Sequence, residues 1–230
     1  MDTAIRTHHG GSGGIGLERI TLAAVVFSFS ASGCAAPFSE MQSARLVGPG
    51  NVEITPSYSY IKWSDEDESE KVQDDFALGV GLGLGERVDV RARYELIKLE
   101  GEDLDQEFFH ALGVGPKLGL VPDRLSFYAP VGFGFGGEIE TSESWQLQPT
   151  LLFTVPVTPQ FEINTSAKGQ IWLNQSDAEN LVAFNLGLGI GQDVTKWAVR
   201  PEVGVLINPG EDGRFWHFSL GFSRTIEGGN

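Results

Sequence analysis

Apolar side chains alternate with glycine or polar residues along most of the chain after residue 50. The run from Phe76 to Leu84, FALGVGLGL, shows the pattern without interruption. Because successive side chains of a strand leave opposite faces of the pleat, a period of two residues predicts β-structure. The pattern recurs about ten times up to the C-terminus. The sequence therefore predicts an all-β fold: a single closed antiparallel up-and-down β-barrel of about ten strands, with eight as the alternative.

The predicted strands are separated by two kinds of connection. The strands cover residues 51–62, 75–84, 87–99, 108–120, 125–136, 145–155, 160–173, 181–192, 197–207 and 215–226. Long polar loops, mostly acidic, alternate with short turns. An even number of strands then places both termini of the chain on the side of the short turns.

The residues between the apolar positions indicate which face points inward. In several predicted strands they are nearly all small, as at Gly79, Gly81 and Gly83. A soluble barrel would cover its exterior with Lys, Glu, Thr and Ser, because glycine lowers strand propensity. Glycine facing a narrow lumen instead leaves room for large side chains from opposite strands. We therefore expect the apolar face to meet lipid.

Large polar side chains on the other strands share the face of these glycines. They are Glu53, Arg87, Asp89, Arg91, Arg93, Glu95, Lys117, Glu162, Lys168, Arg200 and Glu202. Six are basic and five acidic, and buried charges are tolerated only when paired. We predict ion pairs in which the arginines of strand 87–99 reach carboxylates on the first, seventh and ninth strands. Ten strands enclose a lumen that such side chains largely fill.

Aromatic residues on the apolar face gather toward the ends of the predicted strands. Tyr58, Tyr60, Phe76, Trp145 and Trp216 lie toward the loops, and Phe161 and Trp197 toward the turns. Tyr and Trp favour the interface between membrane and water. The alternative reading is ordinary core aromatics.

The first residues have the layout of a secretory signal. A short apolar run, Ile20–Phe29, precedes Ala31-Ser32-Gly33-Cys34, which contains the only cysteine. The small residues before Cys34 resemble a bacterial lipobox, and the resemblance implies cleavage before Cys34 and its acylation. In the alternative, an ordinary signal peptidase cuts nearby and Cys34 is incidental. The expected division is a signal peptide at 1–33, a tether at 34–49 and the barrel at 50–230.

From Asn51 onward the layout resembles a small bacterial outer-membrane β-barrel protein. The resemblance implies location in the cell outer membrane, contact with lipopolysaccharide, and insertion by the barrel assembly machinery. One feature departs from the family: its members usually finish on an aromatic residue, whereas this chain continues past Phe222 to Asn230. The net charge of −15 argues against a nucleic-acid partner.

Three groups of residues are candidates for chemistry. His217 and Ser219 share the luminal face, as in some outer-membrane lipid A deacylases, but a hydrogen-bonded pair is the expected reading. His110 follows Asp103 and Asp105, an arrangement similar to the loop rim of outer-membrane proteases; the default is a solvated histidine. Asp65, Asp67 and Glu68 are weak metal candidates, since their spacing matches no calcium loop.

These observations favour a structural or interaction protein of the outer membrane that is not an enzyme and needs no cofactor. The first alternative is a narrow channel or small-solute transporter. The second is a soluble, lipocalin-like periplasmic barrel that binds an apolar ligand inside.

Overall fold

The computed structural model describes residues 39–65, 68–100, 108–137, 139–174, 180–210 and 213–229, so the expected signal peptide and Cys34 lie outside the described residues. The strands are β1 (Val52–Ser64), β2 (Ser69–Gly83), β3 (Val88–Leu99), β4 (Phe108–Val121), β5 (Leu125–Tyr128), β6 (Val131–Phe135), β7 (Gln146–Leu147), β8 (Thr150–Thr158), β9 (Phe161–Trp172), β10 (Leu181–Ile190), β11 (Trp197–Ile207) and β12 (Arg214–Ile226). A single 3-10 turn, η1, covers Thr141–Glu143.

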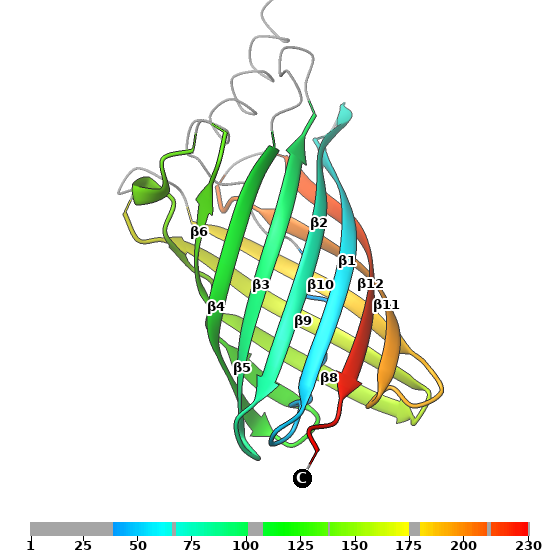
Figure 1. Ribbon diagram of the computed structural model, residues 1–230. Helices are drawn as coiled ribbons and strands as arrows, with labels where there is room; N and C mark the ends of the chain where they lie inside the picture. The colour runs from blue at the N-terminus through cyan, green and yellow to red at the C-terminus, as the bar shows by residue number, and fades with distance from the viewer. Residues whose placement is uncertain are drawn as a thin grey trace, which may run out of the picture.

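These segments close into an antiparallel barrel of ten strands, as the alternation predicted (Figure 1). β12 pairs with β1, and every further pairing in the ring is also antiparallel. β5 and β6 are two halves of one barrel strand, interrupted at Ala129-Pro130, and β7 and β8 are two halves interrupted at Gln148-Pro149. Each interruption contains a proline, which has no N–H to donate to a ladder.

The hairpin of β1 and β2 is longer than the sequence predicted. Residues 63–74 were expected to form an acidic loop, but β1 continues to Ser64 and β2 begins at Ser69. The reason lies in the apolar residues inside the acidic run. Trp63 and Val72 point inward and pack with Ile61, Leu181 and Leu206. Burial of this cluster holds the two strands together through the charged stretch.

The two faces of the barrel have the reverse of a soluble protein's polarity. Large apolar side chains point outward from almost every strand, among them Leu78, Leu112, Leu151, Phe184 and Phe218. The inward face instead buries charged and polar groups. Among the described residues, no helix is long and apolar enough to cross a bilayer.

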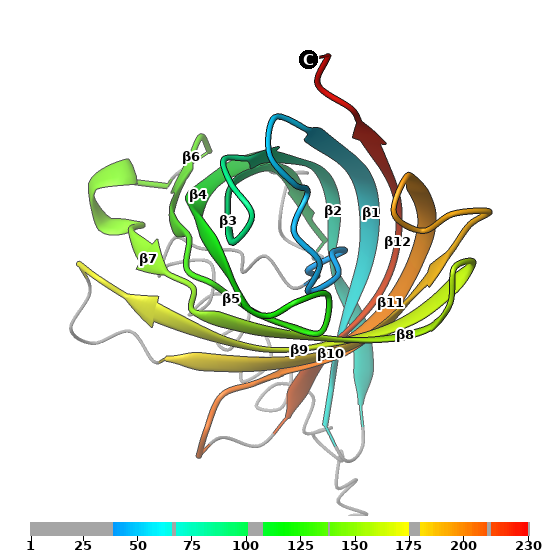
Figure 2. The ribbon, with the colours of Figure 1, turned by 90° about the horizontal axis from the view of Figure 1, so that it is seen from below.

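The N-terminal part of the described chain lies inside the barrel. Figure 2 shows this segment, in blue, within the ring of strands. Residues 39–47, here called the luminal segment, are buried or half-buried, with Met41 and Ala44 only 2% exposed. We expected residues 34–49 to be a tether, but the luminal segment within that stretch lies inside the barrel, toward the turn end. Polar side chains of the lumen form hydrogen bonds with the main-chain N–H and C=O groups of this segment. In a tether these groups would bind water.

Two glycines on inward-facing positions give a matched test of lumen packing. A Cβ at Gly204 would overlap Asn185 Oδ1 and His217 Nε2, whereas at Gly79 the nearest atom would be 3.6 Å away. We expect Gly204→Ala to lower the free energy of unfolding by about 1–3 kcal/mol through overpacking. Gly79→Ala, the control, should change it by less than about 0.5 kcal/mol. Urea titration of the folded protein measures both; equal effects would contradict the packing described.

The turn between β10 and β11 predicts a pH effect. Asp193 Oδ1 accepts hydrogen bonds from the Thr195 hydroxyl at 2.6 Å and the Thr195 N–H at 3.0 Å. These bonds lower the pKa of the Asp193 carboxyl below its ordinary 3.8. A lowered pKa stabilises the fold above the unfolded-state pKa, and this contribution is lost as the pH falls below about 3.8. In Thr195→Val the NMR titration midpoint of Asp193 should rise toward the ordinary value; an unchanged midpoint would contradict this cause.

Candidate functional site

The lumen holds the luminal segment mainly by its main chain. Glu202 accepts hydrogen bonds from the N–H groups of Glu40, at 2.8 Å, and Met41, at 3.1 Å. Lys117 Nζ donates to the carbonyls of Ser43, at 2.6 Å, and Arg45, at 2.9 Å. These buried charges, expected to pair with other strands, are thus satisfied by a peptide backbone.

Further main-chain contacts continue along the segment. Arg93 donates to the Ser39 carbonyl at 2.5 Å. Thr154 Oγ1 accepts the N–H of Ala44 at 2.7 Å, and Asp89 Oδ2 accepts that of Val47 at 2.9 Å. Asp89 lies near the turn end of β3 and Arg93 further along it. The segment therefore runs inside the lumen from Val47, near the turn end, to Ser39, which lies further toward the loop end.

Two side chains of the luminal segment form ion pairs with the wall. Glu40 pairs with Lys168 Nζ at 2.6 Å, and Arg45 pairs with Glu162 at 3.1 Å. Lys168 and Glu162 are 3% and 0% exposed. Glu40 and Arg45 were not among the luminal charges predicted from the sequence, because they precede the alternating region. The only signal was the presence of apolar Met41, Leu46 and Val47 in a stretch taken for a tether.

The predicted luminal charges come together, with one exception. Eight of the eleven are buried, and Glu53 and Arg93 are nearly so. Arg87 is exposed in the turn before β3 and does not belong to the network. It was placed inward because the strand was expected to begin one residue earlier, whereas Val88 is the first residue in the ladder.

The predicted pairing across the lumen is right for one arginine of β3 and wrong for the other. Arg91 reaches Glu53 on β1 at 2.7 Å, with Asp89 at 3.5 Å. Arg93 pairs with Glu95 on its own strand, because its other donors are taken by Ser39 of the luminal segment.

β9 and β11 form an ion pair of their own. Arg200 Nη1 lies 3.0 Å from Glu162 Oε1, and both side chains are at most 3% exposed. Glu162 thus serves two guanidinium groups, that of Arg200 and that of Arg45. The carboxylate of Glu162 therefore links the barrel wall, through Arg200, to the luminal segment, through Arg45.

His217 and Ser219 form the hydrogen-bonded pair that was expected. His217 Nδ1 lies 2.7 Å from Ser219 Oγ, and its Nε2 lies 3.0 Å from Asn185 Oδ1, across β11 at Gly204. His217 and Ser219 are 1% and 8% exposed. The arrangement resembles a nucleophile, base and orienting amide, but neither of the two cavities described below is lined by Ser219. A buried structural hydrogen-bond network of Ser219, His217 and Asn185 therefore accounts for these contacts.

His110 lies in a row of aromatic rings on the outer surface near the loop end. Its ring stacks between Tyr94, with centroids 5.8 Å apart, and Phe135, at 5.1 Å. The row continues through Phe133 to Trp145. Asp103 and Asp105, its expected neighbours, lie outside the described residues. His110 is half-buried in this aromatic row, and its Nδ1 lies 2.6 Å from the Tyr94 hydroxyl.

The metal candidates provide no ion site among the residues that can be placed. Asp65 Oδ1 accepts the N–H of Glu68 at 2.8 Å, and Asp67 lies outside the described residues. Within the described ranges, no group of three or more His, Cys, Asp or Glu side chains could hold a metal ion.

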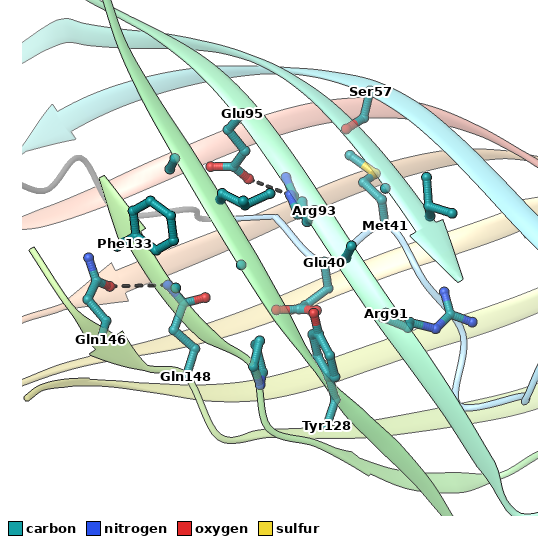
Figure 3. Close-up of a pocket in the computed structure, with 18 of the residues that line it drawn as sticks. Glu40, Met41, Ser57, Arg91, Arg93, Glu95, Tyr128, Phe133, Gln146 and Gln148 are labelled. Atoms are coloured by element: carbon teal, nitrogen blue, oxygen red, sulfur yellow. Dashed lines mark hydrogen bonds and ion pairs between the residues drawn. The ribbon is translucent and has the colours of Figure 1, made fainter. Parts of the chain in front are cut away.

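Two cavities flank the luminal segment. The inner one, on the loop side, has an accessible interior of about 70 Å³ and is lined by Arg91, Arg93, Glu95, Tyr128, Gln146 and Gln148, with Glu40 and Met41 of the segment (Figure 3). The other, about 710 Å³, lies at the turn end between the segment, the turn at 194–197 and residues 224–227. The segment thus lies between a small inner cavity, whose lining also includes apolar residues such as Ile97 and Leu112, and a wide cavity at the turn end.

Comparison with known proteins finds similar structures but no related sequence. No family model matches, and no curated protein matches. Ail, the attachment invasion locus protein of Yersinia pestis, matches at 13% identity over 77% of this chain and 99% of that chain, with a TM-score of 0.37. The translocator domain of autotransporter NalP from Neisseria meningitidis matches at 9% over 90% and 95%, with a TM-score of 0.43. The outer membrane protein OprG from Pseudomonas aeruginosa matches at 8% over 81% and 100%, with a TM-score of 0.32. At such TM-scores these likenesses decide neither family nor function.

Glu162→Gln tests how far the luminal charges depend on one another. The change removes the carboxylate partner of Arg200 and leaves Arg45 only its longer pair with the exposed Asp123, at 3.6 Å. Removing one partner of a buried pair costs about 3–5 kcal/mol, and we expect a loss of this size in urea unfolding. The control is Glu100→Gln, whose half-exposed carboxylate pairs with Lys71 and Lys98 on the outer surface. It should leave the unfolding midpoint unchanged, because water replaces such pairs. Equal midpoints for both variants would show that the luminal pairs carry no stability.

Proposed function

We propose that this protein is a structural or interaction β-barrel of the bacterial outer membrane, closed by its own luminal segment. The observation that carries the proposal is the reversed polarity of the barrel. Its outer face exposes large apolar side chains on nearly every strand, while charged groups such as Lys117 and Glu162 are 0% exposed inside. Contiguous apolar surface on this scale is foreign to soluble monomers and suits contact with lipid.

The height of the apolar band fits a bilayer. On β2 and just beyond it, the outward residues from Phe76 to Leu84 are all apolar and exposed. Eight residues cover about 27 Å along a strand, or roughly 20 Å along the axis of a barrel tilted by about 40°. Outer-membrane barrels carry an apolar band of about 25 Å, so this stretch is close to the required height.

Aromatic residues lie on the outer face toward both ends. The row from Tyr94 to Trp145 lies toward the loop end. At the turn end, Trp197 stacks on Phe222 with centroids 6.1 Å apart. Beyond the loop-side row come charges, Lys71 with Asp74 at 2.6 Å and with Glu100 at 3.1 Å. This order of apolar band, aromatic rings and charges matches the profile of a membrane interface.

The alternatives fit less well. A lipocalin-like soluble barrel needs an apolar interior for its ligand, but this lumen buries ion pairs such as Arg200 with Glu162. A channel needs a continuous path, but Ser39 to Val47 occupy the lower lumen. We therefore favour a closed barrel over a conducting one.

The partners follow from location and stay proposals. The charged outer surface beyond the aromatic row would meet lipopolysaccharide, and the barrel assembly machinery would insert the strands. Acylation of Cys34 remains a prediction from the sequence.

Two arginine substitutions on one strand test the membrane assignment. Val80 lies in the middle of the apolar band and Leu84 at its turn-side edge, and they are 38% and 59% exposed. In phospholipid vesicles we expect Val80→Arg to lower the free energy of unfolding by about 2–4 kcal/mol and Leu84→Arg by about 1 kcal/mol or less. Heat-dependent migration on an SDS gel measures the folded fraction across a urea series. In a soluble barrel both exposed positions would accept arginine equally, so equal costs would overturn the proposal.

A further inference from the structure

The contacts of the luminal segment are those of a receptor with a bound peptide. The segment is not fully extended, because it bends at Ala44 and Arg45 and Met41 has a positive φ of 54°. Seven of its nine residues present a main-chain N–H or C=O to a wall side chain. Every polypeptide offers the same main-chain groups, so such contacts do not depend on the sequence that occupies the lumen. We propose that the lumen is a binding site for peptides supplied from outside, and that residues 39–47 are an internal copy of the ligand. This goes beyond the proposed closed barrel, which assigns the lumen no ligand.

Two side-chain pairs define the preferred peptide. Glu40 meets Lys168 and Arg45 meets Glu162, and both wall groups are at most 3% exposed. A buried charge without its partner is costly, so a peptide that lacks either charge is disfavoured. The ligand class is therefore a peptide with an acidic residue five positions before a basic one.

Glycines in the wall leave space for the other side chains of the peptide. A Cβ at Gly221 would lie 3.1 Å from Met41 Sδ, one at Gly119 would lie 3.0 Å from Leu46 Cδ1, and one at Gly81 would lie 3.2 Å from Val47 Cγ2. These distances are tighter than ordinary contacts, so the small residues are matched to a chain in this position. The inward-facing glycines thus leave the space that the side chains of a bound peptide need.

Three features of the structure favour displacement of residues 39–47 by an external peptide. The contacts that hold it are mainly polar, and water in an emptied lumen would replace many of them. It joins β1 through Gly48-Pro49-Gly50, where both glycines have positive φ, +88° and +76°. The wide cavity at the turn end borders Arg45, Leu46 and Val47 and gives a peptide access to the site.

A binding measurement with a reversed internal copy tests the proposal. In the full-length variant E40K/R45E, the segment's charges face Lys168 and Glu162 with like sign, which weakens the internal copy. The probe is a fluorescein-labelled peptide of residues 39–48, SEMQSARLVG, and anisotropy is read in detergent micelles. We expect it to bind this variant at least tenfold more tightly than wild type, where the internal copy competes at high effective concentration. The same peptide with its two charges exchanged should bind the variant at least tenfold more weakly.

Two matched comparisons separate this site from nonspecific attachment. In the E40K/R45E background, replacing Glu by Gln in the peptide should cost tenfold in affinity with Lys168 present and nothing after Lys168→Gln. N-methylation of the peptide at the position of Ala44 removes the N–H that Thr154 accepts and should weaken binding. N-methylation at the position of Ser43, whose N–H is not among the wall contacts described above, should weaken it less.

The outcomes decide the proposal in either direction. Heat-dependent gel migration first confirms that each variant is folded, and Arg45→Gln replaces the double variant if that one is not. Absence of saturable binding, or equal binding of the native and charge-exchanged peptides, overturns the peptide site. Such a failure leaves the membrane assignment standing, because the depth dependence of arginine substitutions in β2 tests that assignment separately.

Discussion

Charge burial in a closed lumen is the constraint on which the rest of this structure depends. Closing ten strands into a ring brings Arg91, Lys117, Glu162 and Arg200 into a space with little water, where a charge without a partner costs several kcal/mol. The ion pairs between β1, β3, β9 and β11 satisfy part of this demand. The remainder is satisfied by a stretch of main chain, because peptide N–H and C=O groups are strong partners for charged side chains. The luminal segment is thus part of the fold's electrostatic balance.

Glycine on the inward face serves the same constraint by making space. Gly204 lets His217 and Asn185 meet across β11, and Gly221 receives the thioether of Met41. Larger inward residues would fill the lumen with side chains and leave no room for a backbone. At the loop end the wall does the opposite, and Trp63 with Leu206 forms an apolar cluster. The lumen therefore has a wide cavity at the turn end and, toward the loop end, this apolar cluster as well as the small inner cavity lined in part by Arg91, Arg93 and Glu95.

The outer surface follows from what the inner one excludes. With the charges directed inward, the alternating positions left for the exterior are mainly apolar residues such as Leu, Val and Phe, a surface that suits the lipid contact proposed above. The aromatic row at the loop end, the Trp197–Phe222 pair at the turn end and the charges beyond the loop-side row fit the limits of the proposed lipid environment. Occupation of the lumen by residues 39–47 is the reason why we propose a closed barrel and not a channel for solutes.

The sequence by itself predicted a barrel of about ten strands, the position of most strands and the direction of each face, but not the full length of the β1–β2 hairpin. A period of two residues is a local property of the extended backbone, so alternation alone sufficed for β10 and β11 and for the inward placement of Lys168 and Glu202. Only the tertiary structure decided the partners. Whether Arg93 would meet Glu95 or a carboxylate across the barrel depends on distances through the lumen, which no local pattern encodes. The same holds for residues 39–47: they show no strand period, and their place is fixed by contacts with residues more than forty positions away.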